Sequence, residues 1–225
     1  MPFPDRVPPP TDLFRELELA VVETRFPWFR SHLIQPALAG PTSPVYYGKK
    51  GRYRFDDPRL EYGVLYVAQD PHGAFIETFG QLGDTTVALP RSITTITLAA
   101  RSLSELRAQR PLRLADLTGN GLAKIGADSR LFSGPWEAAQ PWSRAIFEHP
   151  SQVDGIFYRS RHDPSRKSAA IFDRGVRWIE YSRTPWLSLA SELRDILNHY
   201  SFALIGSEVV ETPRKKGPIQ EKLHL

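Results

Sequence analysis

The sequence predicts a single mixed α+β domain in which a central β-core is flanked by short helices. Short apolar runs typical of buried strands recur along the chain between helix-start signals, without an internal repeat or a long linker. The chain contains 20 prolines, several beside expected element ends, which favours many short elements over a helical bundle. A length of 225 residues is enough to bury a substantial core.

Composition excludes several classes of site. The chain has no cysteine, which rules out disulfides, zinc–thiolate sites and thiol catalysis. No apolar run approaches the roughly 18 residues of a transmembrane helix, and the N-terminus lacks an apolar signal core, so we expect a cytoplasmic protein. The net charge of +4 fits an anionic substrate, an acidic partner or nucleic acid, and equally a solvated surface with no such role.

Capping and turn residues set the first elements. After a proline-rich lead, Asp12 is a good N-cap for a helix over residues 13–23. Residues 26–33 predict a turn leading into a strand, and the Pro, Gly and Ser of residues 34–50 predict a loop. Residues 52–55 could form a short extended piece that the following Asp-Asp-Pro ends.

The strongest local signal is a strand followed by a capped helix. Gly63–Ala68 is apolar and suits a buried strand. Asp70 is a good N-cap and Pro71 fits the first helical position, so a helix is expected over residues 71–82. The alternating Ile and Thr of residues 93–100 predict a further strand.

The C-terminal half is expected to add strands and helices to the same domain. The strands are expected at 112–117, 153–158, 169–172 and 178–181, and the helices at 119–131, 135–148 and 187–199. The last residues, 211–225, are polar with a basic cluster and are expected to form a tail.

Glu77 is an unusual residue on the helix expected over 71–82. On a helical wheel it lies almost opposite the apolar stripe, which for an arbitrary helix predicts a solvated glutamate. Its neighbours on the helix surface, however, are the small residues Gly73, Ala74 and Gly80. Two glycines destabilise a short helix by about 1 kcal/mol each relative to alanine. One reason to retain them is the close approach of a ligand or another backbone segment.

Several cationic and polar side chains outside this helix each have two interpretations, one structural and one functional. Arg30 lies in an aromatic-rich strand candidate, where it must either reach water or meet an anion. Arg52 and Arg54 could form local salt bridges or bind phosphate. Tyr66 could pack in the core or stack on a ring, and Ser160, at a strand end, could form a turn or belong to a site.

Several familiar motifs are missing from the sequence. There is no GxGxxG and no GxxxxGK[ST], which argues against a Rossmann or P-loop nucleotide site. There is no GxSxG. The 6 histidines lack HxH or HExxH spacing, so we expect no metal site.

Five segments carry a family resemblance: Phe29-Arg30, Arg54–Pro58, Gly63–Ala68, Ala74–Thr78 and Asp154–Arg161. In these segments the chain resembles the RES domain, a family named for an arginine, a glutamate and a serine. The resemblance runs over residues 28–183. It leaves residues 1–27 as an N-terminal extension with a helix, and residues 184–225 as a C-terminal helix and polar tail.

The resemblance implies a fold and an activity. The RES domain resembles ADP-ribosyltransferases of the diphtheria-toxin kind, which implies a β-core of that type. Studied members are toxins of toxin–antitoxin pairs that deplete NAD⁺ by hydrolysis or phosphorolysis, and one group ADP-ribosylates a host-cell protein. Their partners are antitoxins with a helix-turn-helix DNA-binding part, which block the active site.

The resemblance also assigns roles to individual residues. Glu77 would be the family glutamate, whose carboxylate stabilises positive charge on the ribose as the nicotinamide–ribose bond breaks. The other implied roles are phosphate binding by Arg30 and Arg54 with Arg52 beside them, stacking of nicotinamide by Tyr66, and orientation of Glu77 or the ribose by Ser160 or Ser143. No metal is required.

Three functions remain open at this point. The chain could transfer ADP-ribose from NAD⁺ to water or inorganic phosphate, or to a protein or nucleic acid. From another class, it could be a non-catalytic binding module that uses its basic surface.

Overall fold

An eight-stranded, curled β-sheet organises the protein. The computed structural model describes residues 8–34, 42–80 and 91–206. The strands of the large sheet, in spatial order, are β1 (Val21–Thr24), β6 (Leu112–Asp116), β7 (Gly155–Arg159), β8 (Lys167–Phe172), β3 (Val64–Ala68), β2 (Trp28–Leu33), β5 (Arg101–Ala108) and β9 (Trp178–Pro185). Neighbouring strands are antiparallel except β6 and β7. A second sheet pairs β4 (Arg91–Thr94) in parallel with β10 (Phe202–Ile205).

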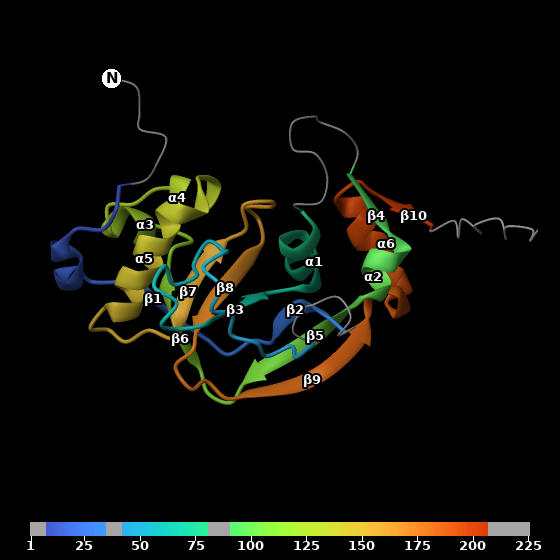
Figure 1. The fold of residues 1–225 in the computed structure, drawn as a ribbon, viewed down its shortest axis with the longest axis horizontal. Helices are drawn as coiled ribbons and strands as arrows, with labels where there is room; N and C mark the ends of the chain where they lie inside the picture. Colours follow the sequence, from blue (N-terminus) through green and yellow to red (C-terminus); the bar gives the residue numbers. More distant parts are fainter. Residues whose placement is uncertain (1–7, 35–41, 81–90, 207–225) are drawn as a thin grey trace, which may run out of the picture.

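Short helices cover this sheet at its two ends and near its middle. They are α1 (Pro71–Phe79), α2 (Thr95–Ala99), α3 (Gly121–Lys124), α4 (Arg130–Ser133), α5 (Trp136–Glu148) and α6 (Ala190–His199). Figure 1 shows α3, α4 and α5 at one end, and α2 and α6 with the small sheet at the other. The predicted single α+β domain is confirmed. None of the helices that the structure describes is long and apolar enough to cross a membrane.

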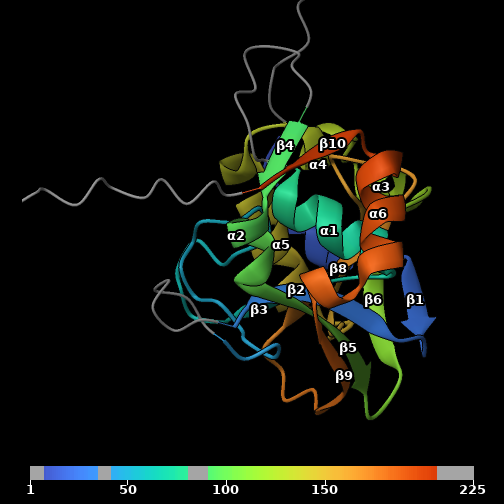
Figure 2. The same cartoon turned by 90° about the vertical axis from the view of Figure 1, so that its right-hand side faces the viewer.

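Helix α1 begins where the sequence predicts. The Asp70 side chain accepts a hydrogen bond of 2.7 Å from the Gly73 backbone N–H, and Pro71 occupies the first turn. Phe75 and Phe79 are buried, and Phe75 packs edge-on against Trp186 at 5.6 Å between ring centroids. This apolar contact, together with α6 alongside (Figure 2), holds α1 on the sheet.

The sheet is weakly joined beneath α1. In the described chain, β2 and β3 pair through one residue pair only, Phe29 opposite Ala68. The other edge of β2 pairs with β5 along its whole length, from Trp28 to Leu33, while Gly48 bridges to Val64 on β3. Helix α1 contacts both β2 and β3. The side chains that follow Phe29 on β2 therefore stand at a junction between two halves of the sheet.

Two predictions for the N-terminal part were wrong. In place of a helix over 13–23, a short 3-10 helix (Asp12–Glu16) is followed by strand β1, because the β-branched pair that opens β1 favours extended backbone against β6. In place of an extended piece over 52–55 there is a turn. The Asp56 carboxylate causes it by accepting the backbone N–H groups of Arg52 and Tyr53. Of the predicted loop over 34–50, residues 35–41 lie outside the described residues. The helix predicted over 71–82 ends earlier, at Phe79 with Gly80 as its C-cap.

Two further predictions need correction, and two strands were missed. The strand expected over 93–100 ends at Thr94, whose hydroxyl accepts the Thr97 N–H and starts α2. The helix expected over 119–131 is divided into α3 and α4 near Gly126, which has a positive φ of 72°. Strands β5 and β10 were not predicted. The tail over 211–225 lies outside the described residues.

One ion-pair cluster fixes the segment before β3. Arg144 of α5 lies 3.1 Å from Asp57, 2.6 Å from Glu61 and 2.5 Å from Glu148. Burial raises the pKa of Asp57, but backbone N–H groups and Arg144 outweigh it, so the net pKa is lowered. The cluster therefore clamps the turn that carries Arg54 onto α5.

Replacing Arg144 by Met should lower the free energy of unfolding by about 3 kcal/mol, because the fully buried Asp57 carboxylate loses its cation. The matched control is Arg15→Met, which removes an exposed partner of Glu148 and should change stability by less than about 1 kcal/mol. Urea unfolding of both variants measures the difference. Equal effects would show that the cluster does not stabilise the fold.

Candidate active site

The Glu77 carboxylate is mostly buried rather than solvated. Its Oε1 atom is buried and has no hydrogen-bond partner among the described residues. Burial raises the pKa of Glu77, while a hydrogen bond with Ser160 and the charges of Arg54 and Arg161 oppose that rise. The net pKa remains raised. A buried carboxylate with an open acceptor and cations nearby is arranged to receive a ligand.

Ser160 is placed to orient this carboxylate. It follows β7, is 1% exposed, and its Oγ accepts the backbone N–H of His162 at 3.2 Å. Because the oxygen of the hydroxyl accepts this bond, its proton can point elsewhere, and the Ser160 hydroxyl lowers the pKa of the nearby Glu77.

Ser143 lies in a different setting. It is fully buried on α5, where its Oγ donates to the Phe55 carbonyl at 2.6 Å and lies 3.1 Å from the Tyr62 hydroxyl. These contacts join α5 to the segment that leads into β3. Ser160 therefore lies near Glu77. The Ser143 hydroxyl instead forms hydrogen bonds within the core.

Arg54 presents a fixed charge near Glu77. Its Nη1 donates to the carbonyls of Leu131 and Gly134, both at 3.0 Å. Burial and Arg161 lower the pKa of Arg54, and Tyr158 and Glu77 act in the opposite direction. Arg52, by contrast, is exposed, and it is its backbone N–H that donates to Asp56, at 3.0 Å.

Tyr66 is anchored by its hydroxyl. The hydroxyl donates to Asp56 at 3.0 Å and accepts the Phe55 N–H at 2.9 Å. Its ring meets Tyr53 edge-on at 5.8 Å between centroids. Burial, followed by the charge of Asp56, raises the pKa of Tyr66. The ring is therefore held in one orientation. It lies near Arg54, because the Tyr66 side chain raises the pKa of the Arg54 guanidinium.

Arg30 is a partly buried cation at the junction of β2 and β3. Its Nη1 donates to the Tyr46 carbonyl at 3.1 Å. Within the described part of the chain, no carboxylate forms an ion pair with it. The pKa of Arg30 is lowered to about 10, mainly by burial. Tyr53 and Tyr46 raise this pKa, and the charge of Arg101 lowers it further. A desolvated guanidinium without a carboxylate is costly unless an anion binds there.

Residues that sequence reasoning missed complete the surroundings. Burial and the nearby charges of Arg161 and Arg91 lower the pKa of His162 to about 4, so its ring is neutral at pH 7. A Cβ on Gly80 would lie 2.8 Å from the Cγ of His162, so this glycine allows the imidazole to approach α1. The sequence did indicate that some group approaches α1 closely at Gly80. Nothing near Gly80 in the sequence identified that group as His162.

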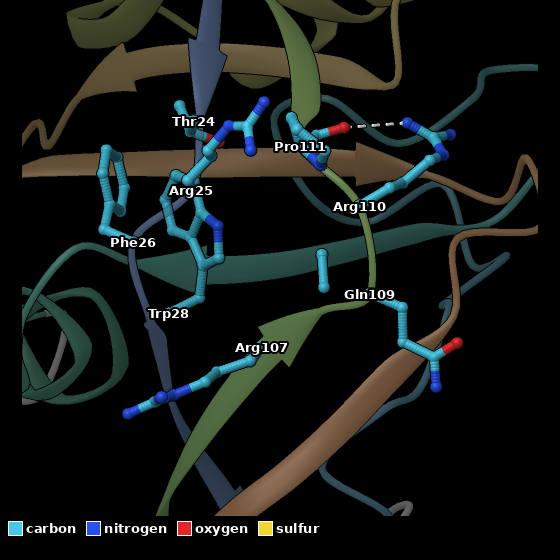
Figure 3. A pocket seen from close by; sticks show the side chains of 9 residues that line it. Thr24, Arg25, Phe26, Trp28, Arg107, Gln109, Arg110 and Pro111 are labelled. Carbon is cyan, nitrogen blue, oxygen red and sulfur yellow. Dashed lines mark hydrogen bonds between the residues drawn. The ribbon is translucent and has the colours of Figure 1, made fainter.

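A surface cavity lies apart from these residues. It has a volume of about 200 Å³ and is found where the β1–β2 link meets the β5–β6 turn (Figure 3). Arg107 and Arg110 line it, but Arg107 pairs with Glu105 and Arg110 with Asp154. Its lining includes none of the residues predicted for the site.

Residues from distant parts of the chain thus lie near Glu77. Ser160 and Arg54 both influence its pKa, Tyr53 influences the pKa of Arg30, and the rings of Tyr53 and Tyr66 are in contact. Such a site can accept a ligand that carries negative phosphates at one end and develops positive charge at the other. Among the described residues, no three His, Asp or Glu side chains gather as a metal site would require.

Comparisons with known proteins identify a family and a similar fold. A family model described as the RES domain matches residues 27–190. A relative named "Probable toxin y4kH" from Sinorhizobium fredii (strain NBRC 101917 / NGR234) is 31% identical over 107 residues, covering 46% of this chain and 83% of the relative. A chain of the M. tuberculosis MbcT-MbcA toxin-antitoxin complex has a TM-score of 0.53 and 17% identity, covering 78% of this chain and 92% of that one. The last likeness shows the fold alone.

Proposed function

The chain belongs to the RES domain family, and from this premise we propose that it is an enzyme that cleaves the nicotinamide–ribose bond of NAD⁺. The observation that carries the proposal is Glu77, a buried carboxylate with an unpartnered oxygen next to guanidinium groups. That combination matches a substrate whose phosphates are anionic and whose ribose becomes cationic during reaction.

The proposed chemistry needs no covalent intermediate. The bond between the ribose C1 and the nicotinamide nitrogen breaks, and its electron pair neutralises the pyridinium ring. Positive charge then develops on the ribose, as it does in glycoside hydrolysis, and the Glu77 carboxylate stabilises it. Water or inorganic phosphate forms the new bond to C1, and the proton of an attacking water passes to solvent.

Other side chains would bind and orient the substrate. Arg30 and Arg54 would bind the pyrophosphate as charged hydrogen-bond donors. The anchored ring of Tyr66 would face the nicotinamide, and Ser160 would hold the carboxylate in place. Ser143 and Arg52, predicted for the site from the sequence, would have supporting or no roles, since one is packed in the core and the other is exposed.

Ser160→Ala should lower the rate of NAD⁺ cleavage about tenfold, and Ser143→Ala should leave it within about twofold. The acid limb of the pH–rate profile should also move to higher pH in Ser160→Ala, because the hydrogen bond that lowers the pKa of Glu77 is lost. Ser143→Ala should instead lower the free energy of unfolding by about 1–3 kcal/mol, because the buried Phe55 carbonyl loses its hydrogen bond from the Ser143 hydroxyl. A reversed pattern would assign the site serine to Ser143.

We further propose that the protein is the toxin of a toxin–antitoxin pair and acts in the cytoplasm. The probable toxin from Sinorhizobium fredii and the chain from a toxin–antitoxin complex support this proposal. The family resemblance adds an antitoxin with a helix-turn-helix domain as the partner that would block the active site. Co-purification of the protein with the product of an adjacent gene would test the partner.

NAD⁺ labelled on its adenylate part separates the possible acceptors. With a hydrolase or phosphorylase, the label appears in ADP-ribose or its 1-phosphate, depending on whether phosphate is supplied. With an ADP-ribosyltransferase, the label moves onto protein or nucleic acid. With a non-catalytic binding module, NAD⁺ stays intact, and the protein is retained on DNA in a salt-dependent manner. We expect label in small products only.

A further inference from the structure

The imidazole of His162 contains a buried polar atom to which the proposed function gives no role. Its Nε2 atom is buried and has no hydrogen-bond partner in the described part of the chain. Buried polar atoms in folded proteins are nearly always hydrogen-bonded, because an unpartnered one has lost its hydration without compensation. An unpartnered nitrogen beside a candidate active site is therefore a candidate contact for a ligand.

The His162 ring is held in place at both its backbone and its side chain. The backbone N–H of His162 donates to the Ser160 Oγ at 3.2 Å, and the N–H of Asp163 donates to the same oxygen at 3.4 Å, so Ser160 fixes the turn that follows β7. The ring lies against Gly80 at the end of α1, where a Cβ would be 2.8 Å from the ring Cγ and 3.0 Å from Nδ1. The Cγ–Nδ1 edge is thus the part of the ring nearest Gly80, and Nε2 is the ring atom opposite that edge.

The Glu77 carboxylate belongs to the same side of α1 as this ring. Gly80 follows Glu77 by three positions, and residues three positions apart are neighbours on a helix surface. Glu77 Oε1 and His162 Nε2 are both buried without a partner among the described residues, and Ser160 lies near both groups. A single ligand bound beside this side of α1 would give both atoms a partner.

The state of the imidazole limits the kind of ligand group that suits it. Burial, followed by the charges of Arg161 and Arg91, lowers the pKa of His162 to about 4. At pH 7 the ring therefore carries no charge that would attract a phosphate, and it offers one N–H donor and one lone pair. A neutral group that both donates and accepts hydrogen bonds satisfies Nε2 whichever tautomer is present.

The carboxamide is the group on the reacting half of NAD⁺ that meets these requirements. It is uncharged, and it has both an amino donor and a carbonyl acceptor. The pyridinium ring separates it from the ribose C1. This separation matches a contact one helix turn beyond Glu77, since Cβ positions three residues apart are about 5–6 Å from each other. The ribose hydroxyls are also neutral, but the proposed function places the ribose at Glu77 itself.

We propose that His162 binds the carboxamide of the nicotinamide ring through Nε2 and makes the site selective for NAD⁺ over dinucleotides whose pyridinium ring lacks that group. The inference rests on the proposed function. In this arrangement Glu77 acts on the ribose, and His162 orients the pyridinium ring that leaves. His162 acts by binding, and it takes no proton in the bond-breaking step.

The test uses two substrates, NAD⁺ and an analogue in which unsubstituted pyridine replaces nicotinamide. Their difference in intrinsic reactivity cancels when the ratio of their kcat/KM values is compared between wild type and variant. The ratio of NAD⁺ to analogue should fall about tenfold in His162→Leu, which corresponds to the loss of one hydrogen bond between neutral groups. His162→Gln should recover part of the ratio, because its amide can donate and accept.

The matched control is His199→Leu, which alters an exposed histidine at the end of α6 and should keep the wild-type ratio. Thermal unfolding of the same samples checks the fold. His162→Leu should melt no lower than wild type, because the variant removes an unpartnered buried nitrogen. The substrate ratio, unlike the total rate, does not change when part of a sample is unfolded.

Two results would overturn the assignment of His162. One is an unchanged ratio in His162→Leu, whether both rates fall or neither does. The other is a similar fall of the ratio in His199→Leu. Failure of the proposed function looks different, because wild type would then cleave neither dinucleotide. In that case calorimetry with the same two dinucleotides decides the matter: a smaller binding preference for NAD⁺ in His162→Leu supports the carboxamide contact, and an unchanged preference or an absence of binding rejects it.

Discussion

Replacing Glu77 by Gln is expected to lower the rate of nicotinamide release from NAD⁺ by about a thousandfold while leaving the fold intact, in line with the loss of one preorganised electrostatic group. Gln has the same shape, but it carries no charge to stabilise the developing cation on the ribose. Initial rates with saturating NAD⁺ measure the effect. Glu23→Gln, which alters an exposed carboxylate on β1, is the matched control and should act like wild type.

The same substitution should not weaken the protein. The pKa of Glu77 is raised by burial, so between the ordinary carboxyl value of 4.5 and the raised value the folded state holds a proton that the unfolded state has lost. Stability therefore falls as the pH rises through that window. Glu77→Gln removes this loss, and its melting temperature at pH 8 should equal or exceed that of wild type, with the difference shrinking below pH 4.5. A marked loss of stability would show that Glu77 serves the fold instead.

Replacing Arg30 by Met should lower kcat/KM for NAD⁺ about a hundredfold, because the substrate loses a charged, bidentate phosphate contact. Arg30→Lys should recover little of this, because an ammonium group cannot reproduce the planar fork. Stability should not fall, since the guanidinium is desolvated and no described carboxylate pairs with it. Thermal unfolding of the same samples checks this point.

The matched control for Arg30 is Arg25→Met, a nearby exposed arginine on the link between β1 and β2. It should leave kcat/KM unchanged. Equal losses in the two variants would indicate a general effect of positive charge on attraction of an anionic substrate, and would remove the specific role given to Arg30.

Strong local signals made much of the fold predictable. Asp70 and Pro71 fix the start of α1 by capping chemistry, and the apolar run of β3 matches a strand buried on both faces. Strand β5 was missed for a physical reason. Its buried leucines, Leu103 and Leu106, are an odd number of positions apart and therefore pack on opposite faces of the sheet, so the sequence shows no simple alternation. A bulge in its pairing with β9 adds to the irregularity.

The candidate site was predictable only where its residues lie close in sequence to strong signals. Glu77 stood out because small residues surround it on a well-defined helix. His162 could not be inferred, because its neighbour in space, Gly80, belongs to a segment far away in the sequence. Whether the serine at position 143 or 160 faces Glu77 was likewise a question of tertiary packing.

The most direct test of the central claim is free nicotinamide released from NAD⁺ by the purified protein, quantified beside the NAD⁺ consumed. We predict equal amounts of the two with wild type, and release about a thousandfold slower with Glu77→Gln. Intact NAD⁺ after prolonged incubation with folded wild-type protein would contradict the claim, and so would release by Glu77→Gln at the wild-type rate.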